Sequence, residues 1–254
     1  MSTELYNDGN HKCIAFYDLD RGAQSNQFLI LDGNHAAFIN PGGDLLYKDL
    51  LMSSQKYIST KSLDYIISSQ QSPDILCDFQ KWLVGNNCKI VIPALWERFI
   101  IQYQTQNDLK NRFILIPDSG MNLQIGNAIL KAIPAHFLRA EVNFQFYDPI
   151  SKIFFSGEMG ASLFLRYSEK VDQPIEDFEA HIHNIEAFHR RWMVNKKVCQ
   201  YWVNMVRDLD IEWLVPQYGR PFKGKAMIER FLKWIEGLEC GTDLVTQENY
   251  KVPS

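Results

Sequence analysis

The sequence predicts an α/β chain of the α+β kind, in which mixed β-sheets carry helices on their outer faces. Three observations lead to this prediction. Short apolar runs bounded by turn residues fill the first 160 residues, a helical segment separates some of these runs, and amphipathic helical patterns dominate the rest of the chain. With 254 residues and no linker or repeat, the chain is expected to form a single domain, residues 1–254, with a substantial core.

Strands are expected where a short apolar run ends at turn residues. The Asp32-Gly33 step between two such runs is typical of a hairpin, and Asp148-Pro149 marks a second turn. A helix is expected at 75–84, between two buried strands. The predicted strands are 26–31, 35–39, 63–67, 89–93, 112–116, 127–133, 143–147, 152–155 and 213–215.

Three helices are expected after residue 160. The first, at 174–191, begins with proline and acidic residues, which first helical turns favour. The second, at 196–209, and the third, at 225–238, each place apolar side chains on one face. These faces are expected to point inward.

The composition excludes several classes of protein. A net charge of −4 and a pI near 5.9 argue against a general nucleic-acid or membrane surface. No apolar run approaches the roughly 18 residues of a membrane helix, and the N-terminus lacks a signal peptide. Five cysteines at scattered spacings, without a CxxC pair, indicate reduced thiols and a cytoplasmic protein rather than a cysteine-based zinc site.

Polar residues follow apolar runs in four segments, as they would at a site built on the rim of a sheet. These segments are SSQQSPD (68–74), AHFLRAEVNF (135–144), FFSGEMG (154–160) and VPQYG (215–219). Taken singly, each segment is also typical of a solvated turn. Their order and spacing together carry the functional interpretation.

The chain resembles the metallo-β-lactamase fold, in particular the diiron domain of flavodiiron proteins and their relatives, the oxygen-binding diiron proteins (ODPs). The resemblance spans nearly the whole chain. It rests on SNQFLILDG…AAFINPGG, with Asn40 in place of an aspartate, on YDPISKIFFSGEMGASLF, and on AFHRRWMVNKKV…IEWLVPQYG. It implies an αββα sandwich, two mixed β-sheets with outer helices, that holds two irons at one rim.

The residues at the ligand positions of that family are mostly unsuited to iron. Gln70, Ser72 and Asp74 occupy the family's His-x-Glu/Asp-x-Asp motif, and Arg139 occupies a histidine position, for which the nearby His136 is an alternative. Glu158 replaces the bridging aspartate, and Tyr218 replaces the histidine of a His-Gly pair. Imidazole and carboxylate bind iron well, whereas arginine offers no lone pair. The resemblance therefore implies a degenerate metal-site pocket.

Arg139 is a candidate replacement for the charge of the metal. Two carboxylates in one recessed pocket repel each other, and a guanidinium could bridge Asp74 and Glu158. The alternative to this bridge is that Arg139 points into solvent and the pocket is merely vestigial. A serine hydrolase is a weaker interpretation, because Ser72 and Ser156 have no adjacent histidine.

The favoured function is a non-catalytic sensor or interaction module, a pseudoenzyme of a diiron oxidoreductase family. The first alternative is a diiron protein that binds or reduces O2 or NO with electrons from a partner, and the second is a hydrolase with a repurposed pocket. No cofactor is expected, with a di-iron centre as the alternative, and no flavodoxin domain with FMN is expected. The resemblance also implies a homodimer, with a protein partner or a small ligand.

Overall fold

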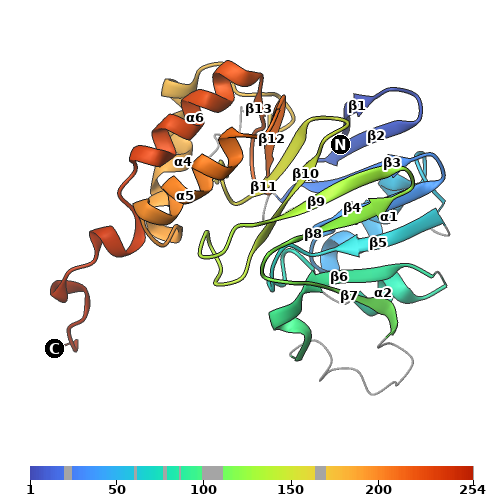
Figure 1. The fold of residues 1–254 in the computed structure, drawn as a ribbon, viewed down its shortest axis with the longest axis horizontal. Coiled ribbons are helices and arrows are strands. Elements are labelled where there is room, and N and C mark those ends of the chain that lie inside the picture. Colours follow the sequence, from blue (N-terminus) through green and yellow to red (C-terminus); the bar gives the residue numbers. More distant parts are fainter. Residues whose placement is uncertain are drawn as a thin grey trace.

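The computed structural model describes residues 1–19, 25–59, 62–76, 79–85, 87–98, 111–163 and 170–253. Two β-sheets face each other at its centre, and helices cover the outer face of each sheet (Figure 1). The layers are therefore αββα, as the family resemblance implied. No helix in the described part of the chain is both long and apolar enough to cross a membrane.

The first sheet has seven strands in the order β1-β2-β3-β4-β5-β6-β7. Strands β1 to β4 are antiparallel neighbours, whereas β4 to β7 pair in parallel. Their bounds are β1 Ser2–Asn7, β2 His11–Phe16, β3 Gln27–Asp32, β4 His35–Ile39, β5 Leu63–Ile67, β6 Lys89–Pro93 and β7 Phe113–Ile116.

The second sheet has six strands in the order β13-β12-β11-β10-β9-β8. Among the described strands of this sheet, β11 and β12 alone pair in parallel, and the other neighbours are antiparallel. The strands are β8 Met121–Ile125, β9 Ala128–Pro134, β10 Phe144–Asp148, β11 Ile153–Gly157, β12 Trp213–Pro216 and β13 Phe222–Lys223.

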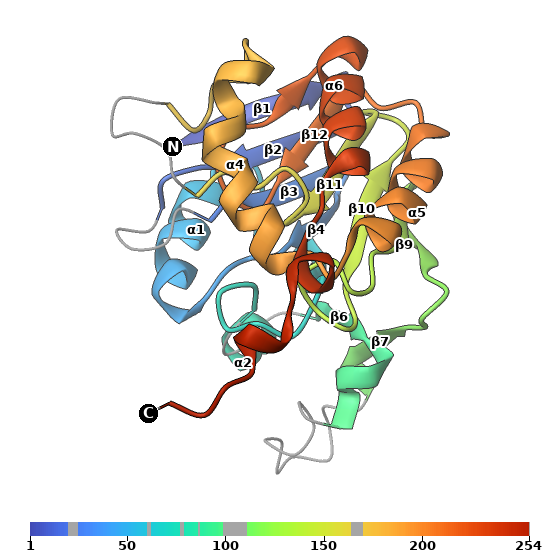
Figure 2. The same ribbon diagram turned by 90° about the vertical axis from the view of Figure 1, so that its left-hand side faces the viewer.

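The helices fall into two groups, one on each side of the sandwich (Figures 1 and 2). Helices α1 and α2 cover the first sheet, where Leu50 and Trp82 pack on Phe38. Helices α4, α5 and α6 cover the second sheet, where Trp202 and Phe231 join the core beneath Phe154. Their bounds are α1 Tyr47–Ser54, α2 Phe79–Leu83, α4 Phe178–Trp192, α5 Lys196–Arg207 and α6 Lys225–Gly237.

A third apolar layer lies between the two sheets. Phe28 and Ile30 from the first sheet meet Phe144, Phe146 and Phe155 from the second, and the rings of Phe28 and Phe155 are 5.0 Å apart. Because a strand presents alternate side chains to opposite faces, β3 and β10 contribute to this layer and to an outer one at once. This explains why every residue of both strands is buried.

The strand directions bring several polar segments to one rim. Strands β4 and β5 are parallel, so that Ile39 and Ile67 pair at their carboxyl ends, and Gly157 and Pro216 pair in the same way at the ends of β11 and β12. Polar residues follow each of these ends. Loops after parallel strands therefore build the pocket described below, as in other open sheets.

Most of the expected strands and helices lie within a few residues of those in the structure, but four strands were not predicted and two helices differ in extent. Strands β4, β5 and β6 have the predicted bounds, while β1, β2, β8 and β13 were not predicted. The helix expected from residue 174 begins at Phe178, because Asp177 caps it by accepting a hydrogen bond from the amide of Ala180 at 3.1 Å. Helix α2 is shorter than the predicted 75–84, although residues 77 and 78 lie outside the described part.

Candidate functional site

Asp74 is held in the rim by two hydroxyl groups. Its carboxylate accepts one hydrogen bond from Ser72, in the same turn after β5, and another from the phenol of Tyr218, which follows β12 in the other sheet. Burial raises the pKa of Tyr218, and the charges of Asp74 and Glu158 raise it further. Tyr218 therefore stays protonated and acts as a donor to Asp74.

Glu158 lies deeper in the same pocket and is 1% exposed. The side-chain amide of Gln70 donates a hydrogen bond to Oε1, and the amide of Asn143 approaches Oε2 at 3.5 Å. Burial raises the pKa of Glu158 to about 7, although the positive charge of Arg139 opposes this shift. At neutral pH this acid is poised between its charged and neutral forms.

An amide pair ties the two sheets together beneath these acids. Asn40 accepts a hydrogen bond from the amide of Ser69 at 2.9 Å and donates one to the side chain of Gln217 at 2.8 Å. Its backbone is left-handed, with φ of 49°, a conformation that asparagine tolerates better than most residues. Asn40 thus positions both the turn that follows β5 and the segment that carries Tyr218.

Arg139 does not form the expected bridge. Among the described residues no carboxylate lies within ion-pair distance of its guanidinium, which instead lies over the ring of Trp192 at 4.3 Å. Its backbone has φ of 87°, a strained conformation for a long side chain. The charge of Arg139 still lowers the pKa of Glu158, so the two residues interact through space without direct contact.

His136, the alternative ligand, is bound to the backbone through both ring nitrogens. Its Nε2 donates to the carbonyl of Asp118 at 2.8 Å, and its Nδ1 accepts from the amide of Asn143 at 3.3 Å. The ring also packs edge-on against Phe144. His136 therefore buttresses the loop before β10 and has no free nitrogen to offer the pocket.

A buried histidine outside the predicted set supports the turn that carries Glu158. His189 of α4 accepts a hydrogen bond from the amide of Gly160 at 2.9 Å and donates to the carbonyl of Ile185 at 2.7 Å. Burial lowers the pKa of His189 to about 4, so the ring is neutral at pH 7 and can accept this bond.

The residues at this rim do not fit two irons. Among the described residues, no three histidine, cysteine or acidic side chains converge here. The two carboxylates present, Asp74 and Glu158, already accept hydrogen bonds from Ser72, Tyr218 and Gln70. Amide, hydroxyl and guanidinium groups are poor iron ligands, and two carboxylates cannot balance the charge of two ferrous or ferric ions.

Sequence reasoning found the acids of the pocket but missed their partners. Five of the predicted residues, namely Gln70, Ser72, Asp74, Glu158 and Tyr218, meet at one rim. Asn143, Gln217 and Trp192 were not predicted, although the segments that contain two of them were singled out. An amide or an aromatic ring in a strand-end segment carries no distinctive spacing, so no signal in the sequence identified them.

Comparison with known proteins identifies the family. The sequence model described as ODP family beta lactamase matches residues 23–219. The structure matches a "Peroxy diiron species of chemotaxis sensor ODP" with 35% sequence identity and a TM-score of 0.86, over 98% of this chain and 99% of that one. It also matches the "Apo state of chemotaxis sensor ODP from T. denticola" with 34% identity and a TM-score of 0.85, over 99% of both chains.

More distant relatives share the fold. A flavo di-iron protein from Thermotoga maritima matches with 17% identity and a TM-score of 0.76, over 93% of this chain and 60% of that one. An uncharacterised protein of Methanocaldococcus jannaschii is 30% identical over 207 residues, which are 80% of this chain and 49% of that protein. The chain spans about half the length of these first curated relatives. It belongs to the ODP family of β-lactamase-fold proteins, which shares its architecture with the flavodiiron cores.

Proposed function

We propose that this chain is a sensor or interaction module of the ODP family whose diiron site has become a hydrogen-bonded pocket. One observation carries the proposal. The residues at the family's ligand positions bind each other: Gln70 donates to Glu158, and Tyr218 donates to Asp74. Neutral donors thus occupy the carboxylate lone pairs that a metal would need.

A sensing role follows from the resemblance and from the chemistry of the pocket. The relative at 35% identity is described as a chemotaxis sensor, and it matches nearly the whole of this chain. Glu158, with a pKa of about 7, changes charge near neutral pH, and the pocket around it joins the two sheets. Protonation or a small polar ligand at Glu158 would alter the contacts between the sheets, which a partner protein could detect.

The remaining expectations belong to this proposal. We expect no resident metal at this rim, no catalytic turnover, a cytoplasmic location and a homodimer. The conflicting possibility, a diiron protein that reacts with O2 or NO, draws on the relative described as a peroxy diiron species.

Iron content tests the loss of the diiron site. The natural protein, produced with iron supplied and purified without chelators, is expected to hold far less than about one iron per chain, measured by plasma mass spectrometry. A variant that restores the family's ligand set is expected to gain iron. It carries the changes Gln70→His, Ser72→Glu, Arg139→His, Glu158→Asp and Tyr218→His.

The control for that variant is the same protein with Asp74→Asn added, which removes the one retained ligand and should reduce the iron again. Natural protein with close to two irons per chain and a reaction with O2 would overturn the proposal. A sensor without metal is also expected to show no reductant-dependent consumption of O2. Any measurable turnover in the natural protein would favour the diiron alternative.

A further inference from the structure

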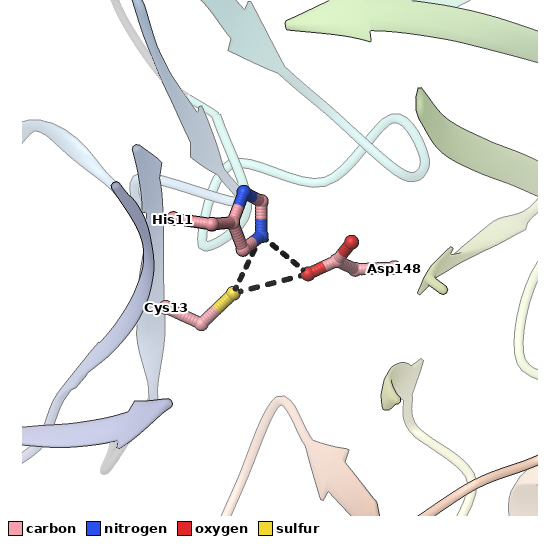
Figure 3. A group of neighbouring side chains, drawn as sticks. All are labelled: His11, Cys13 and Asp148. Atoms are coloured by element: carbon pink, nitrogen blue, oxygen red, sulfur yellow. Dashed lines mark hydrogen bonds and ion pairs between the residues drawn. The ribbon is translucent and has the colours of Figure 1, made fainter. Parts of the chain in front are cut away.

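A second group of polar side chains lies between the sheets at the opposite rim. His11 and Cys13 lie on β2 two residues apart, so both point to the same face, and Asp148 ends β10 in the other sheet (Figure 3). His11 is 1% exposed, Cys13 0% and Asp148 1%. The group is remote from the ODP pocket. His11 pairs with Asp32, which pairs with His35 at the start of β4, whereas the pocket follows Ile39 at the end of that strand.

The three potential ligand atoms form a compact triangle. His11 Nε2 lies 2.8 Å from Asp148 Oδ2, Cys13 Sγ lies 3.3 Å from the same oxygen, and Sγ lies 3.8 Å from Nε2 (Figure 3). The point in their plane that is equidistant from these atoms lies about 2 Å from each, and a point just outside the plane reaches Zn–N, Zn–O and Zn–S bond lengths of about 2.0, 2.0 and 2.3 Å. Ser151 places a further oxygen 3.5 Å from Sγ.

Supporting contacts hold the imidazole of His11 and the carboxylate of Asp148 in place. Nδ1 of His11 lies 3.2 Å from Asp32, whose carboxylate also accepts hydrogen bonds from Asn10 at 3.1 Å and from the amide of Asn127 at 2.6 Å. An aspartate on the outer nitrogen of a metal-binding histidine fixes the ring so that Nε2 faces the metal. The second carboxylate, Asp148, accepts hydrogen bonds from the amide and hydroxyl of Ser151.

The same atoms bind one another when no metal is present. Both ring nitrogens of His11 face a carboxylate, Asp32 at Nδ1 and Asp148 at Nε2. The thiol of Cys13 donates a hydrogen bond to Asp148. A divalent cation bound to Nε2, Sγ and Oδ2 would take the place of these contacts, and its charge would offset the buried carboxylates.

We propose that His11, Cys13 and Asp148 form a zinc site that fastens β2 of the first sheet to β10 of the second. A mixed imidazole, thiolate and carboxylate set suits Zn²⁺, whereas Mg²⁺ and Ca²⁺ prefer oxygen alone. Because the group is buried, the metal enters as the sheets close, and its binding energy adds to folding. The spacing of cysteines could not reveal this site, since Cys13 and Asp148 are 135 positions apart.

Zinc content of matched variants tests the proposal. Protein refolded from denaturant with Zn²⁺ and then desalted is expected to keep about one zinc per chain and to melt at a higher temperature than protein refolded with a chelator. Cys13→Ala is expected to lower zinc affinity at least about tenfold. Cys88→Ala, at a buried cysteine on the outer face of the first sheet, should leave zinc unchanged.

Two measurements separate this site from the ODP pocket and from misfolding. Asp74→Asn should keep the zinc, because Asp74 lies at the other rim. If Cys13→Ala fails to fold, the natural protein refolded with Co²⁺ is expected to show the charge-transfer absorption of a thiolate–cobalt bond. Absence of that absorption, or zinc that is unchanged in Cys13→Ala or lost in Asp74→Asn, would overturn the proposal.

Discussion

Gln70 of the first sheet donates a hydrogen bond from its side-chain amide to the buried carboxylate of Glu158, which follows β11 of the second sheet. This contact joins the sheets at the rim where the strands β5 and β11 end. The other hydrogen bonds to this carboxylate come from its own backbone amide and from Asn143, which approaches only at 3.5 Å. A buried acid with one strong donor depends heavily on that donor.

Replacement of Gln70 by leucine is therefore expected to destabilise the fold by about 1–3 kcal/mol, because Glu158 loses its donor while it remains buried. The free energy of unfolding in urea at pH 8 measures this loss. Gln71→Leu is the matched control, because Gln71 is adjacent and exposed. Equal stability of the two variants would show that the Gln70–Glu158 bond contributes nothing.

The pH dependence of stability is expected to follow Glu158. Its pKa rises from 4.5 to about 7 on folding, so between these values the native state holds a proton that the unfolded state has released. The free energy of unfolding therefore falls as the pH rises from about 4.5 to about 7, by about 3 kcal/mol in total. Above that range the full penalty of a buried charge is present.

Glu158→Gln tests this dependence, since glutamine mimics the neutral acid at every pH. The variant is expected to be more stable than the natural protein at pH 8, by up to about 3 kcal/mol, and equally stable near pH 4.5. Urea unfolding across this range gives both curves, and Glu141→Gln serves as an exposed control. A difference between the curves that stays constant with pH would contradict the assigned pKa.

The fold could be predicted from the sequence more fully than the site could. Strands β4 and β5 are short, mostly apolar runs bounded by turn residues, so their bounds follow from local sequence. Strand β2 was missed because its inward residues include His11 and Cys13, which interrupt the apolar pattern. Their partner Asp148 lies in the other sheet, and a contact across 137 positions leaves no spacing to detect.

In the predicted pocket, too, the sequence indicated which residues meet but not how the side chain of Arg139 is directed. The resemblance placed Asp74, Glu158 and Tyr218 at one rim, and the structure brings them together. It could not place the guanidinium of Arg139, because side-chain direction depends on the left-handed backbone there and on Trp192. The guanidinium stacks on Trp192, 53 positions further along the chain, and does not pair with Asp74 or Glu158.

Substitutions of Arg139 are expected to separate its side chain from its backbone. Arg139→Ala loses the stacking on Trp192, at a cost of about 1 kcal/mol, and keeps the strained φ of 87°. Arg139→Gly loses the same side chain but adopts that φ without strain, so it is expected to be the more stable of the two. Thermal unfolding of both variants measures the difference.

Both Arg139 variants are also expected to raise the pKa of Glu158 further, because they remove the positive charge that lowers it. The fall in stability with rising pH should then extend to a higher pH than in the natural protein. Arg191→Ala, on the neighbouring helix α4, is the control for a general change in charge. An unshifted pH profile in both variants would place Arg139 too far from Glu158 to matter.

The thiols of Cys199 and Cys240 are expected to form a disulfide when the folded protein is treated with diamide. Their sulfur atoms are 3.9 Å apart and both residues are buried. The hydrogen bond with Cys240 and burial raise the pKa of Cys199, whereas the same hydrogen bond lowers the pKa of Cys240, so Cys240 should supply the thiolate that reacts first. The bond would join α5 to the segment after α6 and close a loop across 41 positions, which adds about 4 kcal/mol of stability in the chain-entropy account.

Peptide mass spectrometry identifies the linkage, and Cys199→Ala should abolish both the linkage and the rise in melting temperature, while Cys88→Ala changes neither. Thiols at 199 and 240 that survive prolonged oxidation would show that the backbone holds them too far apart to bond.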